Sequence, residues 1–378
     1  MPFPPSSSLG LPQLQQEASA MEQDGVVSKP VALIACTAMA LFYVAILYAP
    51  AVLLRLPPPP SFNTYMIRRF LCAVVSSILS LFLSALILPV QTKELRHIFG
   101  VFGIRSDHIV SIVYRFNRGM KEHFVLSGDI GKKGHSLLNF LAETWFSWQA
   151  VVLPLCLTSL MYAGSMFLKC LLLLASWRQS TSSGDSFSFD SCKCALQRFL
   201  DWLSATSSNI LVWRNYVVAP LTEELVFRAC MIPLLLCGEF KTYSVILLCP
   251  IFFSLAHLNH FVEIYTKQNY RIMKAVMVIG LQLGYTVVFG SYASFLFIRT
   301  GHLIAPLVAH MYCNFMGLPA FYSHRSGIVS VTFIIGFLGF LWLLFPMTGP
   351  DLYNDRIDNC SCWQRYCTWR ERIRMPQM

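Results

Sequence analysis

The chain has 378 residues, of which 55% are hydrophobic and only 13% are charged, and its mean hydropathy is +0.55. This composition excludes an ordinary soluble domain and is typical of a protein that crosses a membrane several times. The net charge is +10, but the basic residues are spread over the loops instead of being gathered in one domain, which argues against nucleic-acid binding.

The N-terminal residues 1–28 are rich in Ser, Pro and Gln and lack the pattern of a secretory signal peptide. We expect them to form a disordered tail, with the first apolar span serving as an uncleaved anchor. Apolar stretches of about 20 residues, long enough to span the hydrocarbon core, then follow along the chain. They predict eight membrane-spanning helices, near residues 31–54, 70–91, 150–175, 214–237, 242–262, 272–298, 302–320 and 327–346.

The predicted fold class is therefore all-α, a polytopic helical membrane protein with about eight transmembrane helices. Residues 29–213 are expected to form N-terminal transmembrane helices with interfacial and loop segments. Residues 214–347 form a second transmembrane group that holds the unusual polar residues, and residues 348–378 form a polar C-terminal tail.

Two adjacent glutamates and an arginine, Glu223, Glu224 and Arg228, lie inside the apolar stretch 214–237. A charge at mid-bilayer costs about 3 kcal/mol on insertion scales, so three ionisable residues within six positions indicate a specific structural or catalytic role. Glu224 and Arg228 are four residues apart and share a helix face, which favours an ion pair and leaves Glu223 free for another task. The alternative is that both glutamates neutralise Arg228 and hold helices together.

Three further polar side chains lie in apolar helices downstream. His257 follows Phe253 by four residues, and His310 and Asn314 share a helix face, where they could converge on one acceptor atom. Each could equally form an interhelical hydrogen bond. Together with Glu223 they supply a carboxylate base, an imidazole partner and two neutral donors, which is the set that a water-activating hydrolase in the membrane needs.

Other hydrolytic mechanisms fit the sequence less well. It contains no Gly-x-Ser-x-Gly elbow, and no His-Glu-x-x-His zinc motif, because Leu258 and Asn259 stand between His257 and His260. Most of the thirteen cysteines are single residues in apolar segments, where a small buried side chain is the simpler interpretation. We therefore expect no cofactor and no metal ligands, although the spacing does not exclude a dependence on metal.

These segments resemble the eukaryotic type II CAAX prenyl endopeptidases, the Ras-converting enzymes of the CAAX protease and bacteriocin-processing family. The family motifs Glu-Glu-x-x-x-Arg, Phe-x-x-x-His and His-x-x-x-Asn are all present and in order, over roughly residues 200–350. The resembling segments are Arg214 to Cys230, Phe252 to His257, Phe297 to Ile304 and His310 to Asn314.

The resemblance implies an intramembrane endopeptidase of the endoplasmic reticulum that removes the last three residues from farnesylated or geranylgeranylated CAAX proteins. Its implied partners are membrane lipid and prenylated CAAX proteins such as Ras-type small GTPases. The implied roles are catalytic for Glu223 and His257, transition-state stabilising for His310 and Asn314, and supporting for Glu224 and Arg228, with residues 214–347 as the catalytic core.

A non-catalytic membrane scaffold or a transporter is the alternative from another class. Such a protein could use the same ionisable residues for structure or for proton coupling. A transporter is expected to show internal repeats or paired broken helices, and no repeat of fixed period is visible in the sequence.

Overall fold

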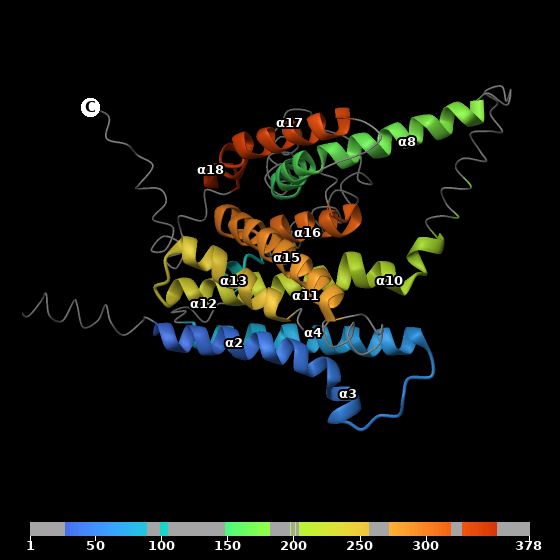
Figure 1. Ribbon diagram of the computed structural model, residues 1–378. Helices are drawn as coiled ribbons and strands as arrows, with labels where there is room; N and C mark the ends of the chain where they lie inside the picture. Colours follow the sequence, from blue (N-terminus) through green and yellow to red (C-terminus); the bar gives the residue numbers. More distant parts are fainter. Residues whose placement is uncertain are drawn as a thin grey trace, which may run out of the picture.

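The computed structural model describes residues 27–88, 99–104, 148–181, 197, 201, 204–256, 272–318 and 327–353, and every regular element in these residues is helical (Figure 1). This confirms the all-α fold class. Nearly all of the predicted N-terminal tail and most of the predicted C-terminal tail lie outside the described residues. The helices form three layers, with α2 and α4 on one side, the central helices α10 to α16 in the middle, and α8 with α17 on the other side.

The first layer consists of two long apolar helices. Helix α2 (Lys29–Ala45) continues through a short 3-10 turn, η1 (Ile46–Tyr48), into α3 (Ala49–Val52). Helix α4 (Phe62–Ile87) begins earlier than the predicted span at residue 70. The Ser61 side chain accepts a hydrogen bond from the Thr64 backbone N–H at 3.2 Å, and this cap lets the helix start in a polar turn that hydropathy alone assigns to the loop.

Helix α4 has small polar residues on its buried face and large apolar residues on its exposed face. It buries Ser76, Ser77, Ser80 and Ser84, while Leu86 and similar residues are exposed. Small residues allow helices to approach closely inside a membrane, where lipid and not water covers the outer surface. The pattern therefore identifies the outer face of α4 as lipid-facing.

The central layer starts with one continuous helical stretch that contains two π-helical turns. It runs through α10 (Ile210–Trp213), the π-helical turn η2 (Arg214–Val218), α11 (Ala219–Glu224), the π-helical turn η3 (Leu225–Cys230) and α12 (Met231–Cys237). Pro220 has no backbone N–H and cannot complete the regular ladder, which accounts for the first π-turn. Residues 226–237 are all buried, so this stretch is the axis of the molecule.

Three more helices surround this axis: α13 (Thr242–Ala256), α15 (Ile272–Thr300) and α16 (Ile304–Met316). Helices α13 and α15 lie against each other at Gly290. A Cβ atom at Gly290 would lie 2.6 Å from Pro250 Cβ and 3.1 Å from a terminal guanidinium nitrogen of Arg228. The absence of a side chain at Gly290 thus brings α15 close to both.

The outer layer contains a bent pair of helices, in which residues Trp148–Met161 meet α8 (Ala163–Thr181) at 79°. Helix α17 (Gly327–Leu343) packs on α8 and leads through η4 (Pro346–Thr348) into α18 (Pro350–Tyr353). Side chains of this layer join those of α15 and α16 in a second apolar cluster that includes Leu157, Tyr292 and Phe340.

The predicted number of eight spans is not confirmed. By length and composition, three described helices can cross a membrane, or four if the bent pair counts as one span. Three shorter apolar helices, α13, α16 and α17, coincide with other predicted spans. The remaining predicted span, 214–237, carries Arg214, Glu223, Glu224 and Arg228 and is the central stretch described above. The division of the chain at residue 214 stays a prediction, since the helical stretch continues through it.

Candidate active site

The two glutamates of α11 lie in different surroundings although they are neighbours in the sequence. Successive helical residues point about 100° apart. The Glu224 side chain is fully buried, whereas 16% of the Glu223 side chain is exposed. One carboxylate is therefore enclosed by protein, and the other borders a pocket.

Glu224 and Arg228 form the ion pair that their spacing predicts. The Arg228 Nη1 and Glu224 Oε1 atoms are 3.0 Å apart, and both side chains are completely buried. The Arg228 guanidinium also lies over the Phe253 ring, at 4.8 Å from its centroid, which compensates part of its desolvation. This buried pair joins α11 to η3 and faces α13.

His310 of α16 lies between the two glutamates. Its Nδ1 atom is 2.7 Å from Glu224 Oε1, and its Nε2 atom is 3.7 Å from Glu223 Oε2. A carboxylate can only accept, so the short contact requires a hydrogen on Nδ1. Glu224 thereby fixes the ring and directs Nε2 toward Glu223, in the manner of the carboxylate that orients a catalytic histidine.

Asn314 lies one turn after His310 and faces the same helical stretch. Its Nδ2 donates to the backbone carbonyl of Asn215 at 2.8 Å, and its side chain is exposed. The Asn215 carbonyl receives no hydrogen bond from the helix itself. The Ala219 N–H donates to the Arg214 carbonyl instead, and Pro220 has no N–H to donate. The two side chains share a face as predicted, but in this structure they contact separate acceptors and do not converge on one atom.

His257, the predicted partner of Glu223, lies outside the described residues, which end in this region at Ala256. Its catalytic role stays a prediction. Phe253, which precedes it by four residues, contacts the site from α13, with its ring centroid 6.3 Å from that of His310. The described part of α13 therefore leads toward the glutamates.

A pocket of about 120 Å³ opens beside Glu223. Its polar lining consists of Glu223, Thr222, Tyr43, Arg69 and Arg214, and the remaining lining residues are apolar. The Tyr43 hydroxyl is 2.9 Å from the Thr222 hydroxyl, so α2 is joined to α11 at the pocket wall.

The sequence motifs did not indicate Tyr43, Arg69 or Arg214 as site residues. Tyr43 is one aromatic residue in an apolar helix, and the two arginines stand near helix beginnings, where basic residues are common at a membrane interface. The packing of α2 and α4 against α11 brings Tyr43 and Arg69 to Glu223, whereas Arg214 belongs to the same helical stretch as Glu223.

None of the eight cysteines in the described residues forms a disulfide bond. Within the described ranges, no group of three or more His, Cys, Asp or Glu side chains is arranged to hold a metal ion. The chemistry that these residues offer is that of a carboxylate at a small pocket, with an imidazole beside it and a side-chain amide one helical turn further along α16.

The comparisons with known proteins agree on one family. Residues 205–316 match the family described as Type II CAAX prenyl endopeptidase Rce1-like, and this range contains both glutamates, Arg228, His257, His310 and Asn314. No solved structure matches the chain.

Curated relatives extend the likeness over nearly the whole chain. The chain is 48% identical to CAAX prenyl protease 2 of Arabidopsis thaliana over 350 residues, which cover 92% of this chain and 100% of that relative. It is 36% identical to CAAX prenyl protease 2 of Homo sapiens over 58% of this chain and 63% of that protein. The Saccharomyces cerevisiae protein of the same name is 31% identical over 29% of this chain and 37% of its own length. The chain belongs to the type II CAAX prenyl endopeptidase family.

Proposed function

We propose that this protein is an intramembrane endopeptidase in which Glu223 activates the water that removes the C-terminal tripeptide from prenylated CAAX proteins. Membership of the family supports the activity. The position of Glu223 supports its role as the base. Its side chain is mostly buried and borders the pocket, and Arg228 forms its ion pair with Glu224 and not with Glu223.

The reaction begins with proton transfer from water to Glu223, assisted by His257. The water oxygen attacks the carbonyl carbon of the scissile peptide bond, and an oxyanion forms on the carbonyl oxygen. The C–N bond then breaks, and the proton held by Glu223 passes to the leaving amine. No covalent bond between enzyme and substrate is needed.

His310 and Asn314 stabilise the oxyanion in this scheme. Because Nδ1 of His310 donates to Glu224, its Nε2 can donate to an oxyanion only when the ring is doubly protonated. Asn314 has a second N–H besides the one directed at Asn215.

The substrates belong to proteins whose prenyl chain keeps them in a bilayer, such as Ras-type small GTPases, and we place the enzyme in the membrane of the endoplasmic reticulum. A prenyl chain contributes about 0.8 kcal/mol of membrane affinity per buried methylene. A site between membrane helices lets that chain stay in lipid while the peptide enters the pocket beside Glu223.

The test is cleavage of a farnesylated peptide by the purified protein in detergent. Glu223→Gln keeps the size of the side chain and its capacity for hydrogen bonds but removes the base, so we expect no measurable turnover with normal accumulation in membranes. Glu239→Gln, which changes an exposed carboxylate shortly after α12, is the control and is expected to cleave as the wild type does. Substantial turnover in Glu223→Gln contradicts the assignment.

A further inference from the structure

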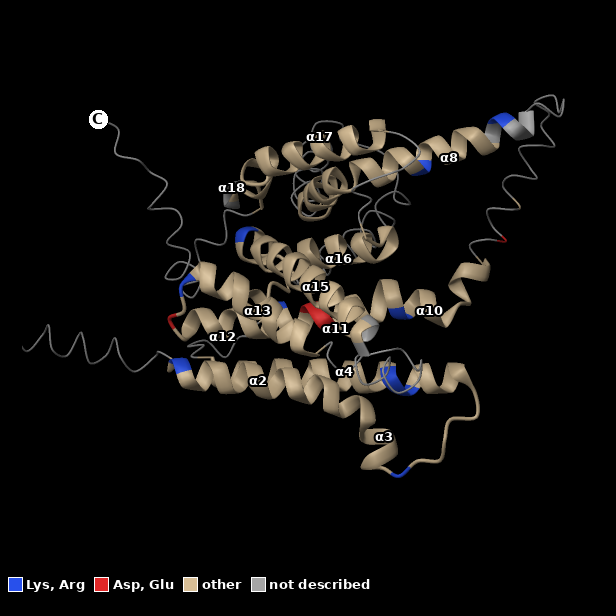
Figure 2. Cartoon of the chain, viewed as in Figure 1, with Lys and Arg blue, Asp and Glu red and all other residues tan. Residues whose placement is uncertain are grey.

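Two arginines stand on the wall of the pocket that Glu223 borders. Arg69 comes from α4 and Arg214 from η2, and both line the same pocket as Glu223. In Figure 2, basic residues lie on α4 and beside α10, near the acidic residues of α11. A cationic wall beside the water-activating carboxylate has no role in the hydrolytic steps described above.

No carboxylate in the described part of the chain neutralises these arginines. Arg69 Nη1 donates to the neutral Tyr65 hydroxyl at 2.8 Å, and its guanidinium lies 5.6 Å from the centroid of the same ring. Arg214 is exposed. The described ion pairs of Glu223 and Glu224 are with His310 and Arg228 and not with Arg69 or Arg214. Arg69 is thus held in place while its charge stays available.

The rest of the pocket is apolar apart from two hydroxyls, those of Tyr43 and Thr222. Its apolar lining residues are Val44, Leu47, Met66, Phe70, Ala73, Val218, Ala219, Phe227, Phe253 and Ala256. The pocket therefore suits a ligand with an apolar body and an anionic end. A peptide that is cut three residues from its terminus has such an end in its own carboxylate.

We infer that Arg69 and Arg214 bind the C-terminal carboxylate of the substrate and so place the third peptide bond from the end at Glu223. The inference rests on the proposed function. A guanidinium presents parallel N–H donors that match a carboxylate, and two of them offset the repulsion from Glu223. Three extended residues span roughly 10 Å, so holding the terminus fixes which bond reaches the water.

The experiment compares two farnesylated peptides of identical sequence, one with a free C-terminal carboxylate and one with a C-terminal carboxamide. For the wild type we expect kcat/KM to be about 10- to 100-fold higher for the acid, the range typical of losing hydrogen bonds to a charged group. In the double variant Arg69→Gln/Arg214→Gln we expect this ratio to fall to near one. The ratio is measured on one preparation, so it does not depend on how much of a variant folds.

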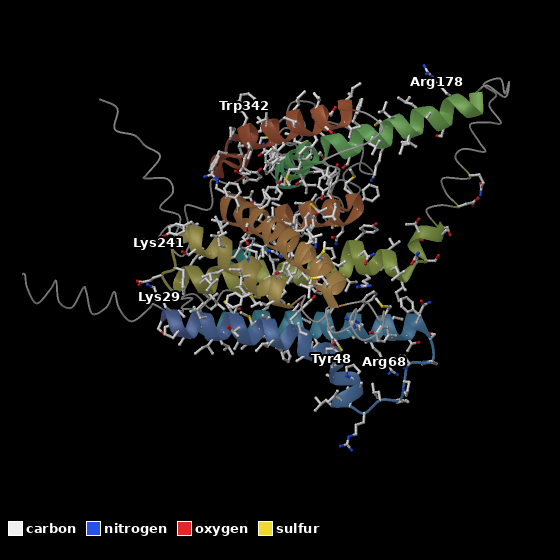
Figure 3. The ribbon with its side chains drawn as sticks, in the orientation of Figure 1. Lys29, Tyr48, Arg68, Arg178, Lys241 and Trp342 are labelled. Carbon is white, nitrogen blue, oxygen red and sulfur yellow. The ribbon has the colours of Figure 1, made fainter. Side chains whose placement is uncertain are left out.

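Arg68→Gln is the matched control. Arg68, labelled in Figure 3, neighbours Arg69 on α4. Its Nη1 donates to the Pro57 carbonyl at 2.8 Å, and it is not among the residues that line the pocket. It should keep the wild-type preference for the acid. The single variants Arg69→Gln and Arg214→Gln should each reduce the preference in part.

Three results overturn the inference. If the wild type cleaves both peptides equally, the proposed function stands but the carboxylate is not recognised. If the double variant loses activity equally on both peptides, the arginines serve the fold or bind the phosphate of a lipid headgroup. If the wild type cleaves neither peptide, the proposed function fails, and this inference fails with it.

Discussion

His310 lies between two carboxylates, and the local sequence does not predict this position. The spacing of Glu224 and Arg228 predicts their ion pair, because both residues belong to one helical stretch. The contact of His310 with both glutamates depends on how α16 packs on α11, which is not a local property of the sequence. The same reason explains why Tyr43 and Arg69 escaped prediction.

Glu224→Gln tests whether Glu224 supports the site and does not perform the chemistry. The substitution keeps an oxygen that can accept from His310 Nδ1 but leaves Arg228 buried without a counter-charge. Removing one partner of a buried pair costs about 3–5 kcal/mol. We expect a clearly lower melting temperature in detergent, with turnover per folded molecule reduced far less than in Glu223→Gln.

The double variant Glu224→Gln/Arg228→Met is the control for this interpretation. Because it removes both charges, we expect it to be less destabilised than the sum of its two single variants. Full additivity of the changes in melting temperature would show that the ion pair is not the cause.

Asn314→Ala separates catalysis from packing. If Asn314 donates to the oxyanion, turnover falls by about 10²–10³ while the affinity for a prenylated peptide changes little. This is the result that we expect from steady-state kinetics. Unchanged turnover with a loss of about 1 kcal/mol in stability would assign Asn314 to the hydrogen bond with Asn215 alone.

Among the elements, the central helical stretch shows where sequence reasoning succeeds and where it ends. An apolar segment with Pro220 near its start predicts a helix at 214–237, and the structure has one. The π-turns on either side of α11 were not predicted, because hydropathy and spacing do not distinguish an α-helical turn from the wider π-helical turn. Such turns occur frequently at functional sites.

The approach of α15 to α13 yields a prediction at this scale. Gly290→Ala introduces a Cβ atom 2.6 Å from Pro250 Cβ, so one of the two helices must shift. Overpacking of this kind costs about 1–3 kcal/mol. The new Cβ atom would also lie 3.1 Å from a terminal nitrogen of Arg228, which pairs with Glu224 in the site. We therefore expect both the melting temperature and the turnover to fall.

Gly280→Ala is the matched control, because Gly280 lies in the same helix and a Cβ atom there would have no neighbouring heavy atom within 4 Å. Replacing a helical glycine with alanine at this position should stabilise the protein by up to about 1 kcal/mol. Equal effects of the two substitutions would contradict the close approach of α15 to α13 as the explanation.

For the whole molecule, composition predicts the class, whereas the number of spans needs the structure. Apolar content identifies a helical membrane protein, but α13, α16 and α17 are short, and one predicted span bends by 79° between Met161 and Ala163. A hydropathy profile records how apolar a segment is, and not whether it is straight or crosses the whole bilayer.

The exposed apolar surface of α4, α8 and α17 predicts how the intact protein behaves in a cell extract. We expect it to stay in the membrane pellet after extraction with alkaline carbonate and to enter solution only with detergent. The Arg69→Gln/Arg214→Gln variant should do the same, because the pocket arginines do not anchor the protein. Release of the wild type by carbonate would contradict a lipid-facing surface.

The π-turn between Leu225 and Cys230 decides where this stretch can change in length. A π-turn holds one residue more than an α-helical turn, and the helix widens locally to take the extra residue. Loss of one residue here is absorbed when the turn closes as ordinary α-helix, so Glu224 and α12 keep their mutual orientation. Loss of one residue within α12, which is already α-helical, would instead rotate its buried side chains by about 100° relative to Glu224. Relatives should therefore differ in length between positions 225 and 230 more readily than within α12.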